Sequence, residues 1–396
     1  MEYIALLRAN KNIRILWFLN LISGFGSWFT VVAIYSLLID FNVSPLIVAI
    51  AAAFHWLPGA LQAPISGTVV DRSDTKKLMY ILLVVEAATT LMMIAVDSPG
   101  LVWLLLLLVF IKMSSASFFF TAEMALIPSL VTQEELRAAN DINSITWSIT
   151  FVVGMATGGL FVEYVGIKEA FILDTLTFGA AILLLTRLDI SKFVKNHTEG
   201  FIHFVKAGFF YIKEHPFLIH LIFLHATVGF TAFDALVALL AKNYYADIVS
   251  EPLAIGFINA IRALGLAMGP FLFIRFKDQK KLLGSLLLGQ GAAILLWAVL
   301  QPSYYAAFIG IFLTGLFSTS IWSLTYSLIQ SSVQKAYYGR VIAYNDMVFL
   351  TTNALVSLMI GILAGYGIAL EMITGILGLL FFGSAVYYKV IRSRLG

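Results

Sequence analysis

Charged residues are scarce in this sequence and cysteine is absent. Asp, Glu, Lys and Arg make up 12% of its 396 residues, whereas a soluble chain usually has about a quarter of its residues charged. The composition therefore excludes a soluble protein of ordinary type. Without cysteine the chain cannot form disulfides, so the sequence does not indicate whether its compartment is oxidising or reducing. The net charge of +3 does not indicate nucleic-acid binding, because in a membrane protein the placement of charges matters more than their sum.

Two catalytic motifs are missing as well. No Gly-Lys pair occurs anywhere, which excludes the phosphate-binding loop of ATP-driven pumps. H-E-x-x-H is also absent, and no connection except the central one is long enough to build an enzyme site. We therefore expect neither an enzyme nor a bound cofactor.

Apolar residues dominate what is present. Hydrophobic residues make up 60% of the chain and the mean hydropathy is +0.93. A helix needs about 20 apolar residues to cross a hydrocarbon core of roughly 30 Å, and backbone groups in lipid must be satisfied within the segment. The sequence predicts an all-α membrane protein with twelve spans, the first of them retained rather than cleaved as a signal peptide. They lie near 15–39, 46–66, 78–96, 101–122, 142–162, 167–186, 217–240, 253–274, 282–300, 304–329, 341–363 and 367–388.

The basic residues predict an orientation for these spans. If both termini are cytoplasmic, all but four of the 25 Lys and Arg residues lie in cytoplasmic segments. Lys168 and Lys242 lie outside, and Lys112 and Arg262 lie within spans. This bias follows the positive-inside rule. We expect a multi-pass protein of the plasma (inner) membrane with both ends inside.

The two halves of the chain resemble each other. Shifted by 204 residues, 76–92 aligns with 280–296, and Glu86 falls over Gln290. Such parallel repeats are typical of transporters built from two six-helix bundles, although apolar helices also resemble each other by chance. We predict pseudo-symmetric bundles over 1–186 and 217–396. The connection 187–216 should act as a cytoplasmic linker with an amphipathic helix, because apolar residues and lysines lie on opposite faces of 199–214.

Five charges are concentrated in GTVVDRSDTKK, residues 67–77. This segment between two predicted spans resembles the cytoplasmic gate loop of the major facilitator superfamily. The resemblance implies a latch that meets the helix starting after Gly339, whereas a simple positive-inside anchor is the alternative. The implied gate residues are Gly67, Asp71, Arg72, Lys76, Lys77 and Arg340.

Other segments narrow the resemblance to one branch of that superfamily. Residues 23–34, 118–140, 171–178 and 199–218 are similar to the branch that contains the enterobactin exporter and macrolide efflux proteins. The similarity to the lysophospholipid transporter is weaker. The resemblance implies the major facilitator fold and alternating access, and it leaves the substrate open.

Charges inside spans are costly, about 2.5 to 3.5 kcal/mol each at the bilayer centre, and need partners or water. Their depths along the predicted spans suggest two pairs, Glu86 with Lys112 and Asp234 with Arg262. Either acid could carry protons during antiport, and static pairs that orient helices are the alternative. The histidines, among them His55 and His225, have no carboxylate at ligand spacing, so we expect no metal site.

Aromatic residues are frequent in the spans that would line a cavity if the resemblance holds. An aromatic, weakly polar cavity suits a bulky amphipathic molecule better than a sugar, and ordinary lipid-facing side chains are the alternative for each residue. The candidates for the cavity are Trp28, His55, Phe119, His225, Phe230, Phe233, Trp322 and Tyr326.

These expectations together describe a secondary transporter that exports an amphipathic organic compound, such as a drug or siderophore, by proton antiport. A lysophospholipid flippase, or a metabolite or metal-ion facilitator on the same fold, is the alternative. The expected partners are the small amphipathic molecule and the lipid bilayer, with no nucleic acid, and we expect a monomer. The proton gradient would supply the energy.

Overall fold

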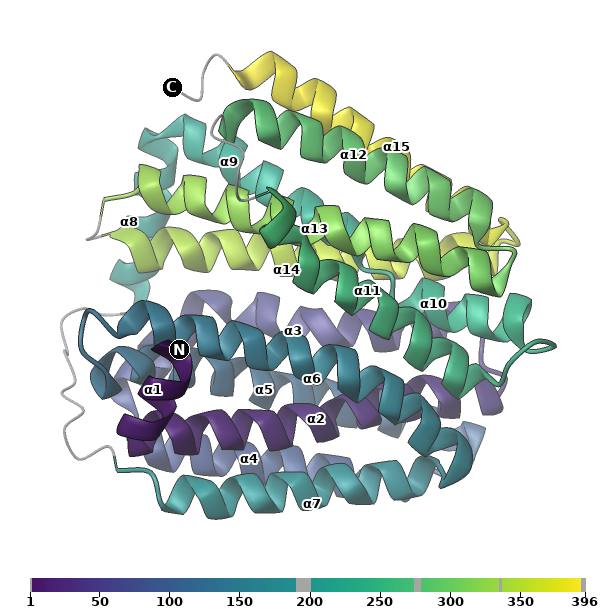
Figure 1. Ribbon diagram of the computed structural model, residues 1–396, viewed down its shortest axis with the longest axis horizontal. Coiled ribbons are helices and arrows are strands. Elements are labelled where there is room, and N and C mark those ends of the chain that lie inside the picture. The colour runs from purple at the N-terminus through teal and green to yellow at the C-terminus, as the bar shows by residue number, and fades with distance from the viewer. Residues whose placement is uncertain (1, 190–200, 274–278, 335–336, 393–396) are drawn as a thin grey trace. The chain divides into compact units, whose positions relative to one another are not determined.

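The structure is a computed structural model that describes residues 2–189, 201–273, 279–334 and 337–392. Its helices pack into two units (Figure 1). The first contains Met1–Phe41 and Ile65–Thr198, and the second contains Asn42–Pro64 and Glu199–Gly396. Residues 42–64 thus group with the second unit rather than with the first, where the predicted bundle limits had put them. The predicted limits at 186 and 217 themselves stay predictions.

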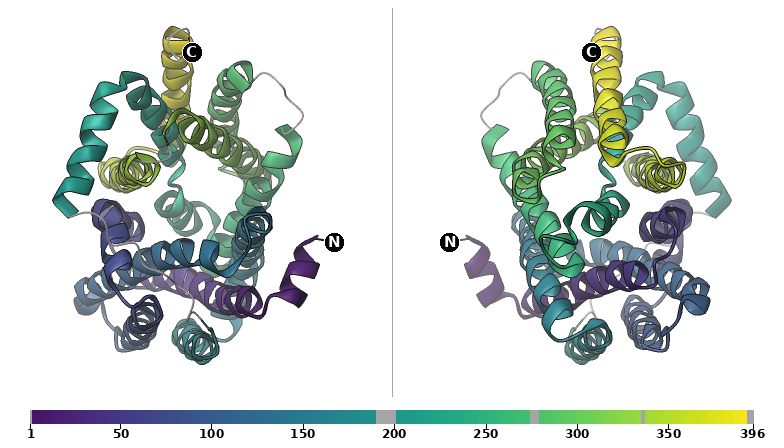
Figure 2. Two further views of the ribbon diagram at one scale, coloured as in Figure 1. Left: turned by 90° about the vertical axis from the view of Figure 1, so that its left-hand side faces the viewer. Right: turned by 90° about the vertical axis from the view of Figure 1, so that its right-hand side faces the viewer.

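The first unit is built around α2. This helix packs against α6 and α7, while α4 packs between α5 and α7. Figure 2 gives two further views of these helices. The helices of this unit are α1 (Glu2–Ala9), α2 (Lys11–Asp40), the last residues of α3 (Pro45–Arg72), α4 (Thr75–Met93), α5 (Val102–Leu130), α6 (Leu136–Tyr164) and α7 (Ile167–Thr186), with a short 3₁₀ turn η1 (Pro99–Leu101) before α5.

The second unit repeats part of this pairing. Its α12 packs between α13 and α15, as α4 packs between α5 and α7. Its elements are the first part of α3, α8 (Phe201–Glu214), α9 (Pro216–Ala226), η2 (Thr227–Thr231), α10 (Asp234–Leu240), η3 (Ala241–Tyr245), α11 (Glu251–Phe273), α12 (Gln279–Leu300), α13 (Tyr304–Ser332), α14 (Tyr338–Gly365) and α15 (Leu370–Ile391). The recurring order of helix neighbours agrees with the predicted internal repeat.

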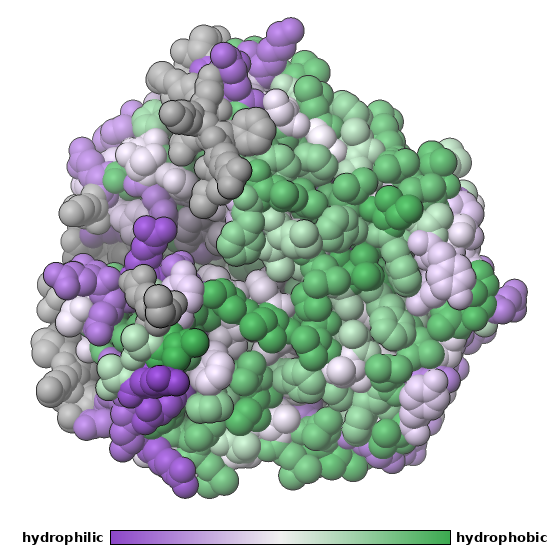
Figure 3. Space-filling model, viewed as in Figure 1, coloured by the Kyte–Doolittle hydropathy of each residue, from purple (hydrophilic) through white to green (hydrophobic). Residues whose placement is uncertain are grey.

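The surface of these helices is suited to lipid. Eleven helical segments among the described residues are long and apolar enough to cross a membrane. The remaining predicted span is α4, whose 19 residues begin with Lys76 and Lys77 in the first turn. On the face shown in Figure 3, hydrophobic side chains cover the middle of the helices and hydrophilic ones gather toward their ends. The protein is an all-α, multi-pass membrane protein.

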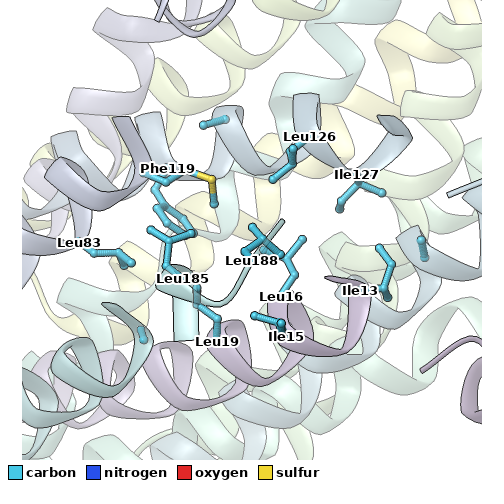
Figure 4. Close-up of a cluster of buried hydrophobic side chains, with 14 of the residues drawn as sticks. Ile13, Ile15, Leu16, Leu19, Leu83, Phe119, Leu126, Ile127, Leu185 and Leu188 are labelled. Carbon is cyan, nitrogen blue, oxygen red and sulfur yellow. The ribbon is translucent and has the colours of Figure 1, made fainter. Parts of the chain in front are cut away.

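The core of the first unit is apolar toward the end where α2 begins. Figure 4 shows its buried side chains pointing toward one another from several helices. Leu16 and Leu19 come from α2, Phe119 and Leu126 from α5, and Leu185 from α7. Removing such side chains from lipid gains little, so close packing must hold these helices together.

Small residues bring helices into close contact in both units. In the second unit, a Cβ built on Gly315 of α13 would collide with the carbonyl oxygen of Arg262 in α11. In the first, a Cβ on Gly154 of α6 would lie 2.9 Å from the Cβ of Trp28 in α2. Such glycines let backbones or large rings approach directly, as is common in membrane helix pairs.

The predicted linker helix is present as α8 and docks on the second unit. Tyr211 stacks on Tyr337 with ring centroids 4.3 Å apart, and its hydroxyl accepts a hydrogen bond from the backbone N–H of Gln334 at 3.2 Å. The Tyr344 hydroxyl donates to the Val205 carbonyl at 3.1 Å. The opposite face exposes Phe209. A helix thus lies where the sequence predicted one, its amphipathic role stays a prediction, and the side chains of 201–204 lie outside the described residues.

Candidate functional site

A buried ionic network occupies the interior of the first unit. Nζ of Lys112 lies 2.8 Å from Oδ2 of Asp174, and both side chains are almost fully buried. Oγ1 of Thr30 donates to the same Asp174 oxygen at 2.6 Å, and Lys112 donates to Oγ1 of Thr90 at 2.8 Å. Lys112 also lies 4.2 Å from the centroid of the Phe178 ring. Helices α2, α4, α5 and α7 are thus tied together by one polar cluster.

The partner of Lys112 differs from the one predicted. We had paired Lys112 with Glu86, but its ion pair is with Asp174. Glu86 is only 5% exposed, and no described residue donates a hydrogen bond to its carboxylate. Both residues lie at a suitable depth, yet depth does not determine which face of a helix carries a side chain. The same depth rule, applied to every charge in the spans, would have included Asp174.

The second predicted pair is confirmed. Nη1 of Arg262 lies 3.5 Å from Oδ1 of Asp234, and its Nη2 donates to the carbonyl of Thr231 at 2.7 Å. The guanidinium also lies 5.3 Å from the centroid of Phe233. The two side chains are 12% and 19% exposed, so this pair is less buried than the one in the first unit.

The predicted continuous helix 217–240 is broken, and Asp234 and Arg262 of α11 meet at the break. The segment is instead α9, the 3₁₀ turn η2, an irregular step, α10 and the π turn η3. Arg262 binds the carbonyl at the end of η2, and Asp234 lies in the first turn of α10. Cations favour carboxyl ends of helices and anions favour amino ends. The pair therefore stabilises both sides of the break, which hydropathy cannot reveal because the segment stays apolar.

Discontinuous helices of this kind often mark binding sites in transporters. Here Gly229 lies against α14, where an added Cβ would be 2.9 Å from Cβ of Thr352 and 3.0 Å from the backbone nitrogen of Asn353. His225 lies one turn earlier, fully buried, with Nδ1 2.9 Å from Oγ1 of Thr325. Its Nε2 has no hydrogen-bond partner among the described residues. Within the same residues, no group of three or more metal-ligating side chains could hold an ion.

The aromatic candidates separate into buried and exposed side chains. Phe119, Phe233 and His225 are buried in the cores of their units. None of the three therefore lines an open surface of its unit. Phe230 packs edge to face against Phe381. Trp322 is 40% exposed and stacks on Tyr326 with centroids 4.9 Å apart.

Two further aromatic candidates lie outside these cores. Trp28 is half-buried and stacks on Phe151 at 4.1 Å, and the exposed Trp147 lies against both rings. His55 is half-buried beside Trp56, with ring centroids 5.1 Å apart. Exposed aromatic pairs are therefore present in each unit.

The proposed gate segment has a different local structure from the predicted loop. Helix α3 continues through Asp71 and Arg72, and α4 starts at Thr75, so only Ser73 and Asp74 connect them. Asp74 explains the short turn, because its side chain accepts from the backbone N–H of Lys77 at 3.0 Å and caps α4. A Cβ built on Gly67 would have no described atom within 4 Å.

Lys76 has a definite structural role in this segment. Its Nζ donates to the carbonyls of Thr186 and Leu188 at 3.0 and 2.6 Å, at the carboxyl end of α7. A lysine at this position compensates the negative helix end. Arg340 lies 5.1 Å from the centroid of Tyr337 at the start of α14. A latch between the two segments stays a prediction.

Sequence reasoning missed one more buried acid. Glu123 of α5 is 4% exposed and accepts a hydrogen bond from Nδ2 of Asn20 in α2. The predicted span 101–122 ends one residue before Glu123, whereas α5 continues to Leu130. A count of charges within the predicted spans therefore does not include this acid, although an acid inside a span is a recognisable signal.

Comparisons with known proteins agree with this architecture. A family profile described as “Transmembrane secretion effector” matches residues 4–394. Over 232 residues the chain is 28% identical to the uncharacterized MFS-type transporter YkuC of Bacillus subtilis (strain 168). This match covers 56% of this chain and only about half of YkuC (54%). Over 309 residues it is 23% identical to macrolide efflux protein A of Streptococcus pyogenes, covering 75% of this chain and 76% of that protein.

Solved structures show the same fold. The crystal structure of a bacterial homolog to the human lysosomal transporter Spinster matches with a TM-score of 0.72 at 14% identity. The match covers 98% of this chain and 97% of that one. At this identity the likeness concerns the fold alone.

Proposed function

Because the chain belongs to the major facilitator superfamily of membrane transporters, we propose that it exports an amphipathic organic compound in exchange for protons. Transport would proceed by alternating access, driven by the proton gradient and without a cofactor. The match to macrolide efflux protein A over three quarters of both chains carries most weight for the direction of transport.

Glu86 is the proposed proton carrier. Its carboxylate lies inside an apolar helix, receives no hydrogen bond from a described residue, and interacts electrostatically with Lys112 and Asp174. Ionisable residues within spans commonly form proton relays. Asp174 is engaged by Lys112 and Thr30, which leaves Glu86 as the acid of this cluster that can change protonation without breaking an ion pair.

Asp234 is a weaker candidate than Glu86. Its interaction with Arg262 and its place in the first turn of α10 support a structural role at the helix break. Protonating Asp234 would remove the partner of Arg262. We therefore assign the coupling role to Glu86 and regard Asp234 as a support for the broken helix.

The exposed aromatic pairs support an amphipathic substrate. Trp322 with Tyr326 in the second unit, and Trp28 with Trp147 in the first, offer large apolar faces with few polar groups. Such rings bind flat or bulky organic groups through area rather than through many hydrogen bonds.

The test uses purified full-length protein in liposomes with a pH-sensitive dye inside and an imposed pH gradient. A macrolide, an amphipathic dye, a catecholate siderophore and a lysophospholipid are added in turn. We expect proton movement with at least one of the first three and its loss in Glu86→Gln. Glu163→Gln, at an exposed position of α6, is the matched control and should keep the flux.

Other outcomes would assign the protein differently. Movement of a compound that ignores the pH gradient would indicate a facilitator for that compound rather than an antiporter. Flux evoked by lysophospholipid alone would indicate a lipid flippase. Unchanged proton flux in Glu86→Gln would remove Glu86 from the coupling mechanism and leave transport itself intact.

A further inference from the structure

Glu123 lies in a polar cluster formed by three helices of the first unit. Nδ2 of Asn20 in α2 donates to Oε1 of Glu123 in α5, and the same Nδ2 lies 3.4 Å from Oδ1 of Asn143 in α6. Glu123 is 4% exposed, whereas both asparagines are half-buried. The cluster thus begins in the interior of the unit and reaches its surface through two amides.

The carboxylate of Glu123 has no countercharge in the described part of the chain. No Lys, Arg or His there forms an ion pair with it. Lys112 is on the same helix but about 16 Å away along its axis, from a rise of 1.5 Å per residue, and is engaged by Asp174. Oε2 of Glu123 accepts no hydrogen bond from a described residue. A buried charge without a partner is expensive, and a cationic group of a ligand would offset that cost.

The surroundings of Glu123 are apolar. On α5, Phe119 lies one turn before it and Leu126 and Ile127 one turn after it, and on α2 Leu19 adjoins Asn20. These side chains belong to the cluster drawn in Figure 4. The carboxylate is therefore set in a packed apolar core, and the half-buried amides of Asn20 and Asn143 lie on its way to the surface of the unit.

The three residues also lie at similar depth. Asn20, Glu123 and Asn143 are each about 10 to 14 Å from the ends of their helices that lie at Lys11, Leu130 and Leu136. The distribution of basic residues predicts that these ends are cytoplasmic. An exporter takes up its substrate from that side, and the cluster is placed where an incoming polar head group could reach it.

We propose that Glu123, with Asn20 and Asn143, forms the binding site for a protonated amine of the transported compound. The inference rests on the export function proposed above and restricts its substrate to amphipathic amines. Oε2 of Glu123 and the amide oxygens would accept the N–H donors of the ammonium group. An organic ammonium fits better than a divalent metal, which requires six or more oxygen ligands.

The experiment measures binding of a matched pair of fluorescent probes to the full-length protein in lipid nanodiscs. Dansylcadaverine has an aromatic body and a primary ammonium group, and its N-acetyl derivative has the same body without the charge. We expect wild type to bind the amine about ten- to hundredfold more tightly, the size expected for a charge-assisted hydrogen bond in a desolvated site. In Glu123→Gln this ratio should fall to about one while the acetyl probe binds as before.

Control variants separate the site from general effects. Glu163→Gln removes an exposed carboxyl group from the same unit and should leave the ratio unchanged. Glu123→Asp keeps the charge and should retain part of the preference. Retained binding of the acetyl probe shows that Glu123→Gln is folded.

The remaining outcomes overturn the inference. Equal binding of both probes to wild type, or an undiminished ratio in Glu123→Gln, would show that Glu123 does not bind the amine. A dependence of probe binding on Na⁺ over choline that is lost in Glu123→Gln would assign the site to an inorganic cation. Gradient-driven transport of the acetyl probe tests the export function separately, because it does not require Glu123.

Discussion

The two units place their polar residues differently although their helices pair alike. In the first, the space between α4, α5 and α7 holds Glu86, Lys112 and Asp174. In the second, the residue equivalent to Glu86 is Gln290, which is fully buried. Neither its amide nitrogen nor its oxygen has a hydrogen-bond partner among the described residues. The same pairing of helices thus encloses charge in one unit and a neutral amide in the other.

The charged pair of the second unit lies elsewhere, at the break between η2 and α10. Its partners are a carbonyl at a helix end and a carboxylate at a helix start, so its role follows from the backbone around it. The first unit instead has the continuous helix α2, which contributes Thr30 to the ionic network. Helix packing therefore does not require buried charge. The charged residues of each unit are better explained by the side chains and backbone groups that they contact.

The largest effect is expected from separating Lys112 and Asp174. Asp174→Asn should lower the free energy of unfolding by about 3 to 5 kcal/mol, because it leaves a buried ammonium group without its counterion. Replacing both residues, as Lys112→Met with Asp174→Leu, should restore most of the loss, since apolar groups of similar size avoid desolvation. Chemical unfolding in mixed micelles measures both variants.

The control for this variant is a neutral hydrogen bond in the second unit. Oγ1 of Thr374 donates to Oε1 of Gln301 at 2.9 Å in a fully buried hydrogen bond. Thr374→Val should cost only about 1 kcal/mol. Equal losses for Asp174→Asn and Thr374→Val would mean that the ionic character of the first unit has no energetic significance.

Exchanging the equivalent residues of the two units should give the next largest effect. Gln290→Glu puts a carboxylate at a fully buried position and should destabilise by about 2.5 to 3.5 kcal/mol, the cost of a charge at mid-membrane. Glu86→Gln keeps the shape of the side chain and should cost less than about 1 kcal/mol. Unfolding free energies of the two variants test this asymmetry, and a similar loss in both would contradict it.

Much of the helix content could be predicted from the sequence, because hydropathy over about 20 residues reports directly on lipid exposure. Counting depth along the spans also led to the pair of Asp234 with Arg262. The same method wrongly paired Glu86 with Lys112, because depth gives height along a helix but not direction around it. Asp174 lies at a similar height on another helix, α7, and forms the ion pair with Lys112.

Local breaks and extensions were less predictable. The segment 217–240 stays apolar across its break, so hydropathy reads it as one helix. Residues 67–72 look like a loop because they contain charges, yet α3 runs through Pro64 and Gly67 and continues to Arg72. Charges beyond the membrane surface do not end a helix when water can solvate them.

Helix spacing allows a third comparison of the units. Gly315→Ala would push a Cβ against the Arg262 carbonyl and to within 3.0 Å of the Leu266 nitrogen, which are backbone atoms that cannot rotate away. Gly158→Ala places its Cβ 3.3 Å from Cα of Phe29, where a small shift suffices. We expect a loss of about 1 to 3 kcal/mol for Gly315→Ala and a smaller one for Gly158→Ala, measured by thermal unfolding in detergent. The reverse order would show that α11 and α13 yield more easily than α2 and α6.

The smallest effect on stability is expected at the helix break, where it should be local. Arg262→Lys keeps the positive charge but cannot bind Asp234 and the Thr231 carbonyl with two separate nitrogens, so we expect a cost of about 1 kcal/mol. Hydrogen exchange followed by mass spectrometry should show faster exchange across 227–240 and no change in α2, which is continuous. Uniformly faster exchange in both units would instead mean that Arg262 stabilises the whole protein. Unchanged exchange at the break would show that the backbone there is held by its packing, for example by Gly229 against α14, rather than by the guanidinium.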